Sequence, residues 1–158
     1  MTKPLSDVNW KTNYWQKSTV EPIGNSNEIP EREKILQPYL YPSSDTLMHG
    51  WSGRSRHVHS VPPDVIELLI QKGYLKRNES QNESPTTEQF LRFMKRWRQY
   101  TVLAHGYEIS KERDDCRITI EGIEVEHPPT IRDHRFAEDW FELTNGADEC
   151  NEFYCWWD

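Results

Sequence analysis

Apolar residues recur at helical spacing in three stretches of the chain, and a pair of prolines marks one further short helix. A short helix is expected over about Pro30 to Gln37, between two prolines suited to its start and its end. A second helix follows Pro62-Pro63, with Gly73 where a C-cap belongs and with apolar residues Val65, Ile66, Leu68, Leu69 and Ile70. A third begins at Thr86, and its apolar face comprises Phe90, Met94, Trp97, Thr101 and Ala104.

The start and the expected end of this third helix are both marked in the sequence. Thr86 with Gln89 three residues later predicts a capping box. The apolar period continues to Ala104, so we expect His105-Gly106 to end the helix. A fourth helix is expected from His134 to Leu143, with Phe136, Trp140 and Leu143 on one face.

Elsewhere apolar and polar residues alternate, so that apolar residues recur at every second position, which is typical of strands. Short strands are expected at residues 39–41, 56–61, 107–109 and 117–121, with a continuation past Gly122 to Val125. The charged run 111–115 is expected to form a hairpin loop. The last segment alternates, with Phe153, Cys155 and Trp157 on one face and Tyr154 and Trp156 on the other.

Helices and strands do not alternate strictly along the chain, and this order favours an α+β fold. We expect a single small domain, with three to four helices packed on a short, mainly antiparallel sheet. Residues 1–50 hold five of the ten prolines and show no sustained period. We therefore expect an extended, irregular N-terminal arm over 1–50, packed on the core through Trp10, Tyr14 and Trp15, and an α+β domain over 51–158.

The composition shifts the expected core toward aromatic rings. Leu, Ile, Val and Phe together supply only 32 of 158 residues, whereas Trp and Tyr occur seven times each. No stretch approaches 18 apolar residues and no secretory signal is visible, so we expect a cytoplasmic protein outside the membrane. Cys116, Cys150 and Cys155 are odd in number and lack metal-ligand spacing, which predicts reduced thiols.

The net charge of −7 is distributed unevenly along the chain. Residues 51–113 carry a net charge of +4, whereas residues 114–158 carry 13 acidic and three basic residues. An acidic surface with aromatic residues suits contact with a basic macromolecule, because opposite charges speed association and Trp and Tyr supply hot spots. The expected partner-binding residues are Glu138, Asp139, Trp140, Asp148, Glu149, Glu152, Tyr154, Trp156 and Asp158.

This pattern predicts a non-enzymatic protein with a basic protein partner. Immunity proteins, toxin inhibitors and defence antagonists have roles of this physical kind, by analogy of charge and size alone. The alternative is a solvated acidic surface whose charge is neutralised by the basic helix within the fold.

A second hypothesis is contact with nucleic acid through basic residues, with aromatic neighbours such as Trp97 and Tyr100 stacking on bases. In the loop 49–56, backbone amides and serines could also cradle a phosphate. The residues expected to contact an anion or nucleic acid are Arg54, Arg56, Arg92, Lys95, Arg96 and Arg98.

The third hypothesis concerns three histidines, His49, His57 and His59. Three imidazoles could hold a catalytic zinc, and a strand would place His57 and His59 on one face. However, the sequence contains no HExxH, CxxC or GxSxG motif. We therefore expect no metal, no other cofactor and no catalytic residue.

Overall fold

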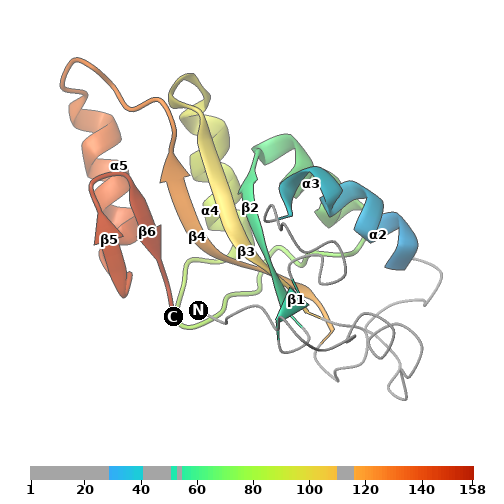
Figure 1. The fold of residues 1–158 in the computed structure, drawn as a ribbon. Helices are drawn as coiled ribbons and strands as arrows, with labels where there is room; N and C mark the ends of the chain where they lie inside the picture. Colours follow the sequence, from blue (N-terminus) through green and yellow to red (C-terminus); the bar gives the residue numbers. More distant parts are fainter. Residues whose placement is uncertain (1–28, 41–50, 53–54, 110–115) are drawn as a thin grey trace.

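The computed structural model describes residues 29–40, 51–52, 55–109 and 116–158 (Figure 1). Within these ranges there are four α-helices: α2 (Ile29–Leu36), α3 (Pro63–Gln71), α4 (Thr87–Arg96) and α5 (His134–Thr144). Two 3-10 turns also occur there, η2 (Gln37–Tyr39) and η3 (Arg98–Tyr100). The strands of this part are β1 (Trp51–Ser52), β2 (Ser55–Val61), β3 (Val102–Ile109), β4 (Ile118–Val125), β5 (Glu149–Asn151) and β6 (Tyr154–Trp156).

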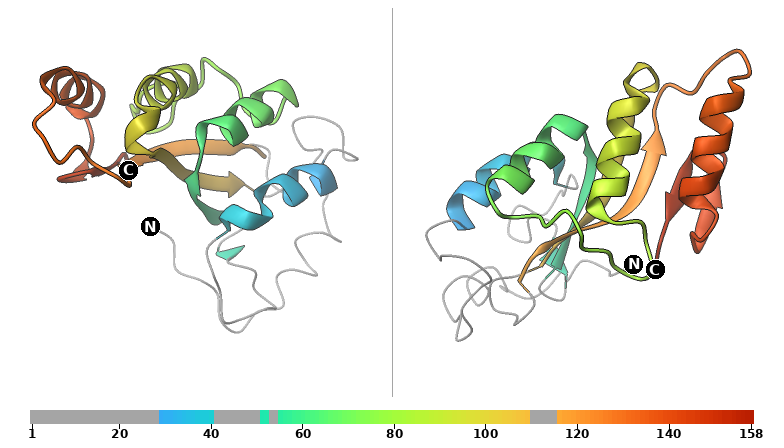
Figure 2. Two further views of the ribbon diagram at one scale, coloured as in Figure 1. Left: turned by 90° about the horizontal axis from the view of Figure 1, so that it is seen from above. Right: turned by 180° about the vertical axis from the view of Figure 1, so that it is seen from behind.

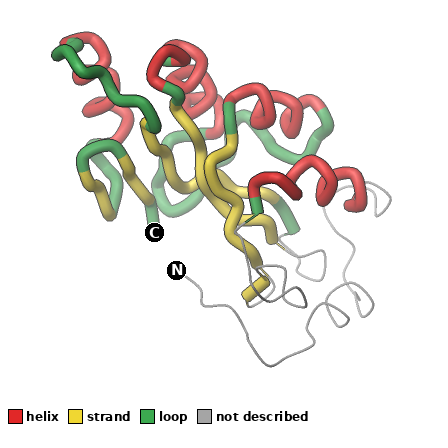
Figure 3. Tube along the Cα trace, turned by 45° about the horizontal axis from the view of Figure 1, so that its top comes forward, coloured by secondary structure: helices red, strands yellow, loops and turns green. Residues whose placement is uncertain are grey.

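The strands form one antiparallel sheet in the order β1-β2-β3-β4-β6-β5 (Figure 3). Helices α3, α4 and α5 lie over one face of this sheet (Figure 2). The α+β prediction of a small domain with helices on an antiparallel sheet is therefore confirmed. The arm segment 1–28 and the loop 111–115 lie outside the described residues. No helix of the described part is both long and apolar enough to cross a membrane.

The core between helices and sheet is rich in aromatic rings, as the composition predicts. Trp157 follows β6, and its ring meets Phe90 of α4 edge-on, with 5.4 Å between the ring centroids. Phe136 of α5 packs edge-on against Trp97 at 5.3 Å, and against Tyr100 at 4.9 Å. These contacts attach α5 to the end of α4, which fixes the position of the acidic C-terminal region.

The two strongest local signals in the sequence are confirmed. The Thr86 hydroxyl accepts the Gln89 amide at 3.2 Å, and the Gln89 side chain accepts the Thr86 amide at 2.8 Å, which completes the capping box. Gly73 follows α3 with φ of 82°, the left-handed conformation that glycine adopts without steric cost.

The expected end of the third helix is wrong. Helix α4 stops at Arg96, η3 follows, and Thr101 takes φ of 52° before β3 begins at Val102. Residues 102–105 pair with β4 on one side, and Ala104 also pairs with β2. Thr101 and Ala104 have the spacing of a helical face, but pairing with strands on both sides places this segment in the sheet instead.

Helix α2 is tied to the sheet by a buried ionic triad. Glu108 of β3 is 0% exposed; its carboxylate accepts Arg32 Nε of α2 at 3.0 Å and Arg56 Nε of β2 at 2.6 Å. Arg32 also donates to the Ile109 carbonyl at 3.3 Å. Leu36, on the same helix, is fully buried in the core. Residues 29–36 are therefore part of the packed fold.

Candidate interaction site

Helix α5 presents one apolar face to the core and a different stripe to solvent. Asp133 caps the helix by accepting the Phe136 amide at 3.0 Å. Phe136 and Trp140 face α4, because both rings contact Phe93. The outer stripe follows the helical repeat, and all of its members are exposed: Glu138, Phe141, Glu142 and Asn145.

Phe141 is the unexpected member of this stripe, because its side chain is 69% exposed. Among large apolar side chains of the described residues, only Ile131, in the turn before α5, is more exposed. Sequence reasoning missed Phe141 because it listed only the core-facing residues of this helix. A helical wheel was the available signal, since position 141 falls off the face that carries Phe136, Trp140 and Leu143.

The carboxylates around this stripe are mostly without ion pairs. Residues 126–158 contain nine acidic and two basic residues. Within the described residues, only Asp139 of this group forms an ion pair, with Arg96 at 3.0 Å; it also accepts Trp97 Nε1 at 3.0 Å. Asp148 accepts the backbone amide of Asp158 at 2.8 Å. The acidic residues that keep an uncompensated charge there include Glu138, Glu142, Glu149 and Glu152.

We call Glu138, Phe141 and Glu142, on the outer stripe of α5, the acidic face. The hairpin formed by β5 and β6 adds Glu149 and Glu152, but Glu149 lies opposite Trp156 in the strand register and so points to the sheet face opposite α5. Figure 1 shows α5 and this hairpin together at one end of the molecule.

The other expected aromatic contacts lie deeper. Trp156 is only 5% exposed and packs on the sheet face opposite the helices, with its ring near His57 and Tyr107. Tyr154 is half-buried on the same face against His105. Trp140, on α5, is half-buried, and its ring packs against Phe153. These three rings therefore serve mainly to pack the sheet and α5.

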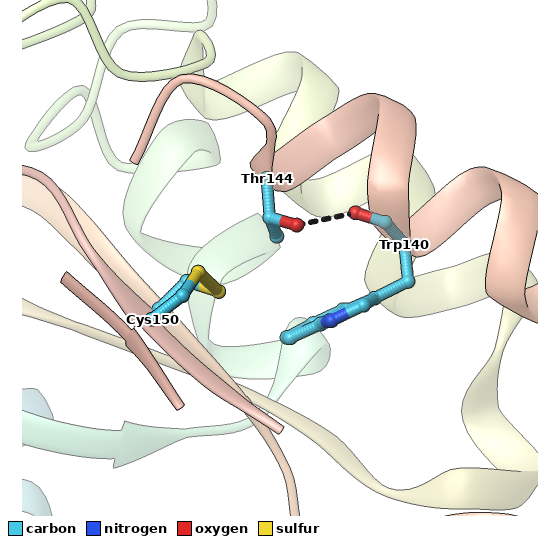
Figure 4. The surroundings of a disulfide bond; sticks show 4 residues. Trp140, Thr144 and Cys150 are labelled. Atoms are coloured by element: carbon cyan, nitrogen blue, oxygen red, sulfur yellow. Dashed lines mark hydrogen bonds between the residues drawn. A yellow bond between two sulfur atoms is a disulfide. The ribbon is translucent and has the colours of Figure 1, made fainter. Parts of the chain in front are cut away.

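The structure corrects the prediction of reduced thiols for two of the three cysteines. Cys150 of β5 and Cys155 of β6 face each other across the hairpin and form a disulfide. Figure 4 shows Trp140 and Thr144 of α5 beside it, and the Thr144 hydroxyl donates to the Trp140 carbonyl at 2.6 Å. Cys116 is a free, buried thiol. The disulfide fixes a hairpin of which β5 is fully exposed.

The basic residues expected to contact nucleic acid are paired within the fold. Their ion pairs are Arg92 with Glu88 at 3.8 Å, Lys95 with Glu67 at 2.6 Å, Arg96 with Asp139 at 3.0 Å, and Arg98 with Asp64 at 2.9 Å. The hydrogen bond from Arg98 holds the pKa of Asp64 below its usual value. Arg56 is 1% exposed in the buried triad, and Arg54 lies outside the described residues. Among the described residues, the acidic C-terminal region thus forms an ion pair with the basic helix only through Asp139.

The histidines gather on the sheet face opposite the helices. His57, His59 and His105 form a stack with ring centroids 5.8 to 6.4 Å apart. Gly122 underlies this face: a Cβ there would lie 2.5 Å from Trp156 Cε3. His49 lies outside the described residues. Within those residues, no set of three or more His, Cys, Asp or Glu side chains is arranged to hold a metal ion.

Hydrogen bonds fix the ring orientation in this stack. His105 Nε2 donates to Glu124 at 3.1 Å, and its Nδ1 accepts the Ser60 amide at 3.4 Å. The bond from His105 keeps the pKa of Glu124 below its usual value. Burial, followed by the charges of His105 and His59, lowers the pKa of His57 to about 4. His57 is therefore neutral at physiological pH and suits packing better than proton transfer.

Comparison with known proteins gives no relative from which a role could be transferred. No family model matches the sequence, and no curated protein or solved structure is significantly similar to it.

Proposed function

We propose that the protein is a non-enzymatic binding protein whose acidic face contacts a basic protein partner. The role would be of the immunity, inhibitor or defence-antagonist kind. The observation that carries the proposal is Phe141, which is 69% exposed between two glutamates that form no ion pair with any described residue.

The energetics of this arrangement favour a partner. Transfer of a fully exposed phenylalanine side chain from water to an apolar site releases about 1.5–3 kcal/mol. Because Phe141 stays mostly exposed, folding of the chain itself gains little of this free energy. Aromatic rings at the centre of an interface are frequent hot spots. The surrounding carboxylates would attract a basic surface over a distance of about one Debye length and raise the association rate.

A protein partner suits this surface better than a nucleic acid. The phosphates of a nucleic acid would be repelled by the acidic face. The four basic side chains at residues 92–98 are partly exposed, but each already pairs with a carboxylate, so they offer a phosphate little uncompensated charge.

The proposal can be tested by capture from a lysate of the native host. Immobilised wild-type protein is compared with the double variant Glu138→Gln/Phe141→Ala and with the control Glu79→Gln, which removes the same number of charges elsewhere. We expect wild type and control to retain a basic protein at low salt, and the double variant to lose it.

Two results would contradict the proposal. One is retention of the same species by all three proteins; the other is a retained species that is acidic or is removed by nuclease. Once the partner is purified, Phe141→Ala alone should weaken its binding about 30-fold, as expected for a hot spot of roughly 2 kcal/mol.

The cytoplasmic location predicted from the sequence belongs to the same proposal. A reducing cytosol keeps cysteines as thiols, so in that compartment Cys150 and Cys155 would be unbridged. Rapid alkylation of cells at lysis, followed by mass spectrometry, should then find both residues alkylated. An intact bridge in such cells would instead indicate an oxidising compartment.

A further inference from the structure

A pocket of about 250 Å³ lies beside the acidic face. It opens between the loop before α4, the C-terminal end of α5 and the segment after β6. Its lining includes Glu83, Pro85, Glu142, Leu143, Asn145 and Trp157. The pocket is smaller than the roughly 300–1,000 Å³ of sites for drug-sized ligands, so it suits a single long side chain.

The charge of the pocket is negative from two independent sources. The first is the pair of glutamates, Glu83 and Glu142, which come from different elements and form no ion pair within the described residues. The second is the end of α5. No described amide donates to the carbonyl oxygens of Glu142 and Leu143, so this helix end keeps its partial negative charge.

The start of α4 does not offset this charge. Its first amides are already used: Thr87 donates to the Glu79 carbonyl, Glu88 to the Arg77 carbonyl and Gln89 to the Thr86 hydroxyl. The helix N-terminus at the pocket therefore has no free first-turn amide to offer an anion. A cation is the ligand that these groups favour.

The remaining walls suit the stem of a long cationic side chain. Trp157 is 1% exposed, so its indole forms the floor, and Leu143 and Pro85 add apolar surface. Lysine and arginine commonly lay their methylene groups on such surface while the charged head meets carboxylates. Arginine suits it better, because its five N–H donors can reach several acceptors at once.

The loop that carries Glu83 is held in an unusual conformation. Asn82 and Glu83 both have positive φ, at 52° and 60°. The turn is kept closed by the Ser84 amide, which donates to the Gln81 carbonyl at 2.8 Å, and by Asn82, which donates to Glu121 at 2.7 Å. These bonds fix the backbone that places Glu83 at the pocket.

We infer that this pocket binds an arginine side chain of the basic partner. The inference rests on the proposed function and makes it more specific, because it assigns the charge recognition next to Phe141 to one residue of the partner. Glu83 and Glu142 would accept the guanidinium N–H groups, and Leu143 and Trp157 would contact the stem.

The test uses the full chain and Nα-acetyl-L-arginine methylamide, followed by amide and indole NMR shifts. We expect saturable shifts at residues 83–85 and 142–146 and at the Trp157 indole, with a dissociation constant in the millimolar range. The citrulline analogue, which has the same shape without the charge, should cause no such shifts. Glu83→Gln and Glu142→Gln should each weaken arginine binding about tenfold, whereas the exposed control Glu126→Gln, outside the pocket, should leave it unchanged.

Equal shifts with the citrulline analogue, or no shifts at the pocket residues, would overturn the inference. A lysine analogue that binds as tightly as the arginine analogue would overturn the assignment to guanidinium. Failure here is distinguishable from failure of the proposed function, because capture of a basic partner through Glu138 and Phe141 does not require the pocket.

Discussion

The buried ionic triad gives the sharpest stability prediction, through the substitution Glu108→Gln. The carboxylate of Glu108 is fully buried and accepts Arg32 at 3.0 Å and Arg56 at 2.6 Å. Glutamine has nearly the same shape, so the substitution leaves the packing in place. It removes the negative charge between two guanidinium groups and turns an amide NH₂ toward one of them.

The expected loss follows from what each arginine retains. Removal of one partner from a buried ion pair typically costs 3–5 kcal/mol. Arg32 keeps its bond to the Ile109 carbonyl at 3.3 Å, and Arg56 keeps Glu33 at 3.6 Å. These contacts place the expected loss near the lower end, at about 3 kcal/mol, which is a large part of the roughly 5–15 kcal/mol that stabilises a domain.

Urea unfolding followed by tryptophan fluorescence measures this loss. With a slope of about 2 kcal/mol per molar urea, the midpoint should fall by about 1.5 M. The exposed control Glu126→Gln should stay within about 0.5 kcal/mol of wild type. A loss below 1 kcal/mol for Glu108→Gln would refute the reasoning, since it would mean that the triad contributes no more than a surface pair.

Three further predictions concern separate elements. Because the pKa of His57 is about 4 in the fold and near 6.5 when unfolded, its contribution to stability is complete above pH 6.5 and is lost as the pH falls toward 4. The full pKa shift corresponds to about 3 kcal/mol of stability, which partial exposure of the ring reduces to about 1–2 kcal/mol. In His57→Phe the free energy of unfolding should therefore change less between pH 7 and pH 4 than in wild type, and an unchanged slope would contradict this. Thr86→Ala should remove the capping box at a cost of about 1 kcal/mol and lower the melting temperature by about 2–4 °C, and an unchanged melting temperature would show that the cap is dispensable. The Cys150–Cys155 disulfide closes a short loop and therefore stabilises the fold by only about 2 kcal/mol. The free energy of unfolding measured with and without dithiothreitol should differ by no more than that.

Local signals in the sequence predicted the elements whose structure depends on neighbours in the chain. The capping box at Thr86, the left-handed Gly73 and the alternation of the last strand all reappear in the structure. The end of the third helix could not be predicted in this way, because β3 is set by pairing with β2 and β4. Strand β5 was missed because all three of its residues are exposed and show no apolar period.

The candidate site shows the same division between local and long-range information. The excess of acidic residues after position 114 could be counted in the sequence. The burial of Trp156 could not be predicted from the sequence, because it depends on the histidine face of β2 and β3. The ion pairs of Arg98 with Asp64 and of Lys95 with Glu67 could not be predicted either, because they arise from the packing of α3 beside α4. The disulfide likewise depends on the register of a strand that the sequence did not reveal.

Among the described strands β5 is the last of the sheet, so one row of its backbone groups has no strand partner there and is open to pairing with a second copy of the chain. Its short length and Glu149 oppose such pairing, and the net charge of −7 keeps copies apart at neutral pH. This repulsion fades near the isoelectric point of about 5.4. The carboxylates proposed to attract a basic partner thus also prevent edge-to-edge aggregation. A charge-neutral acidic face would lose recognition and colloidal stability together.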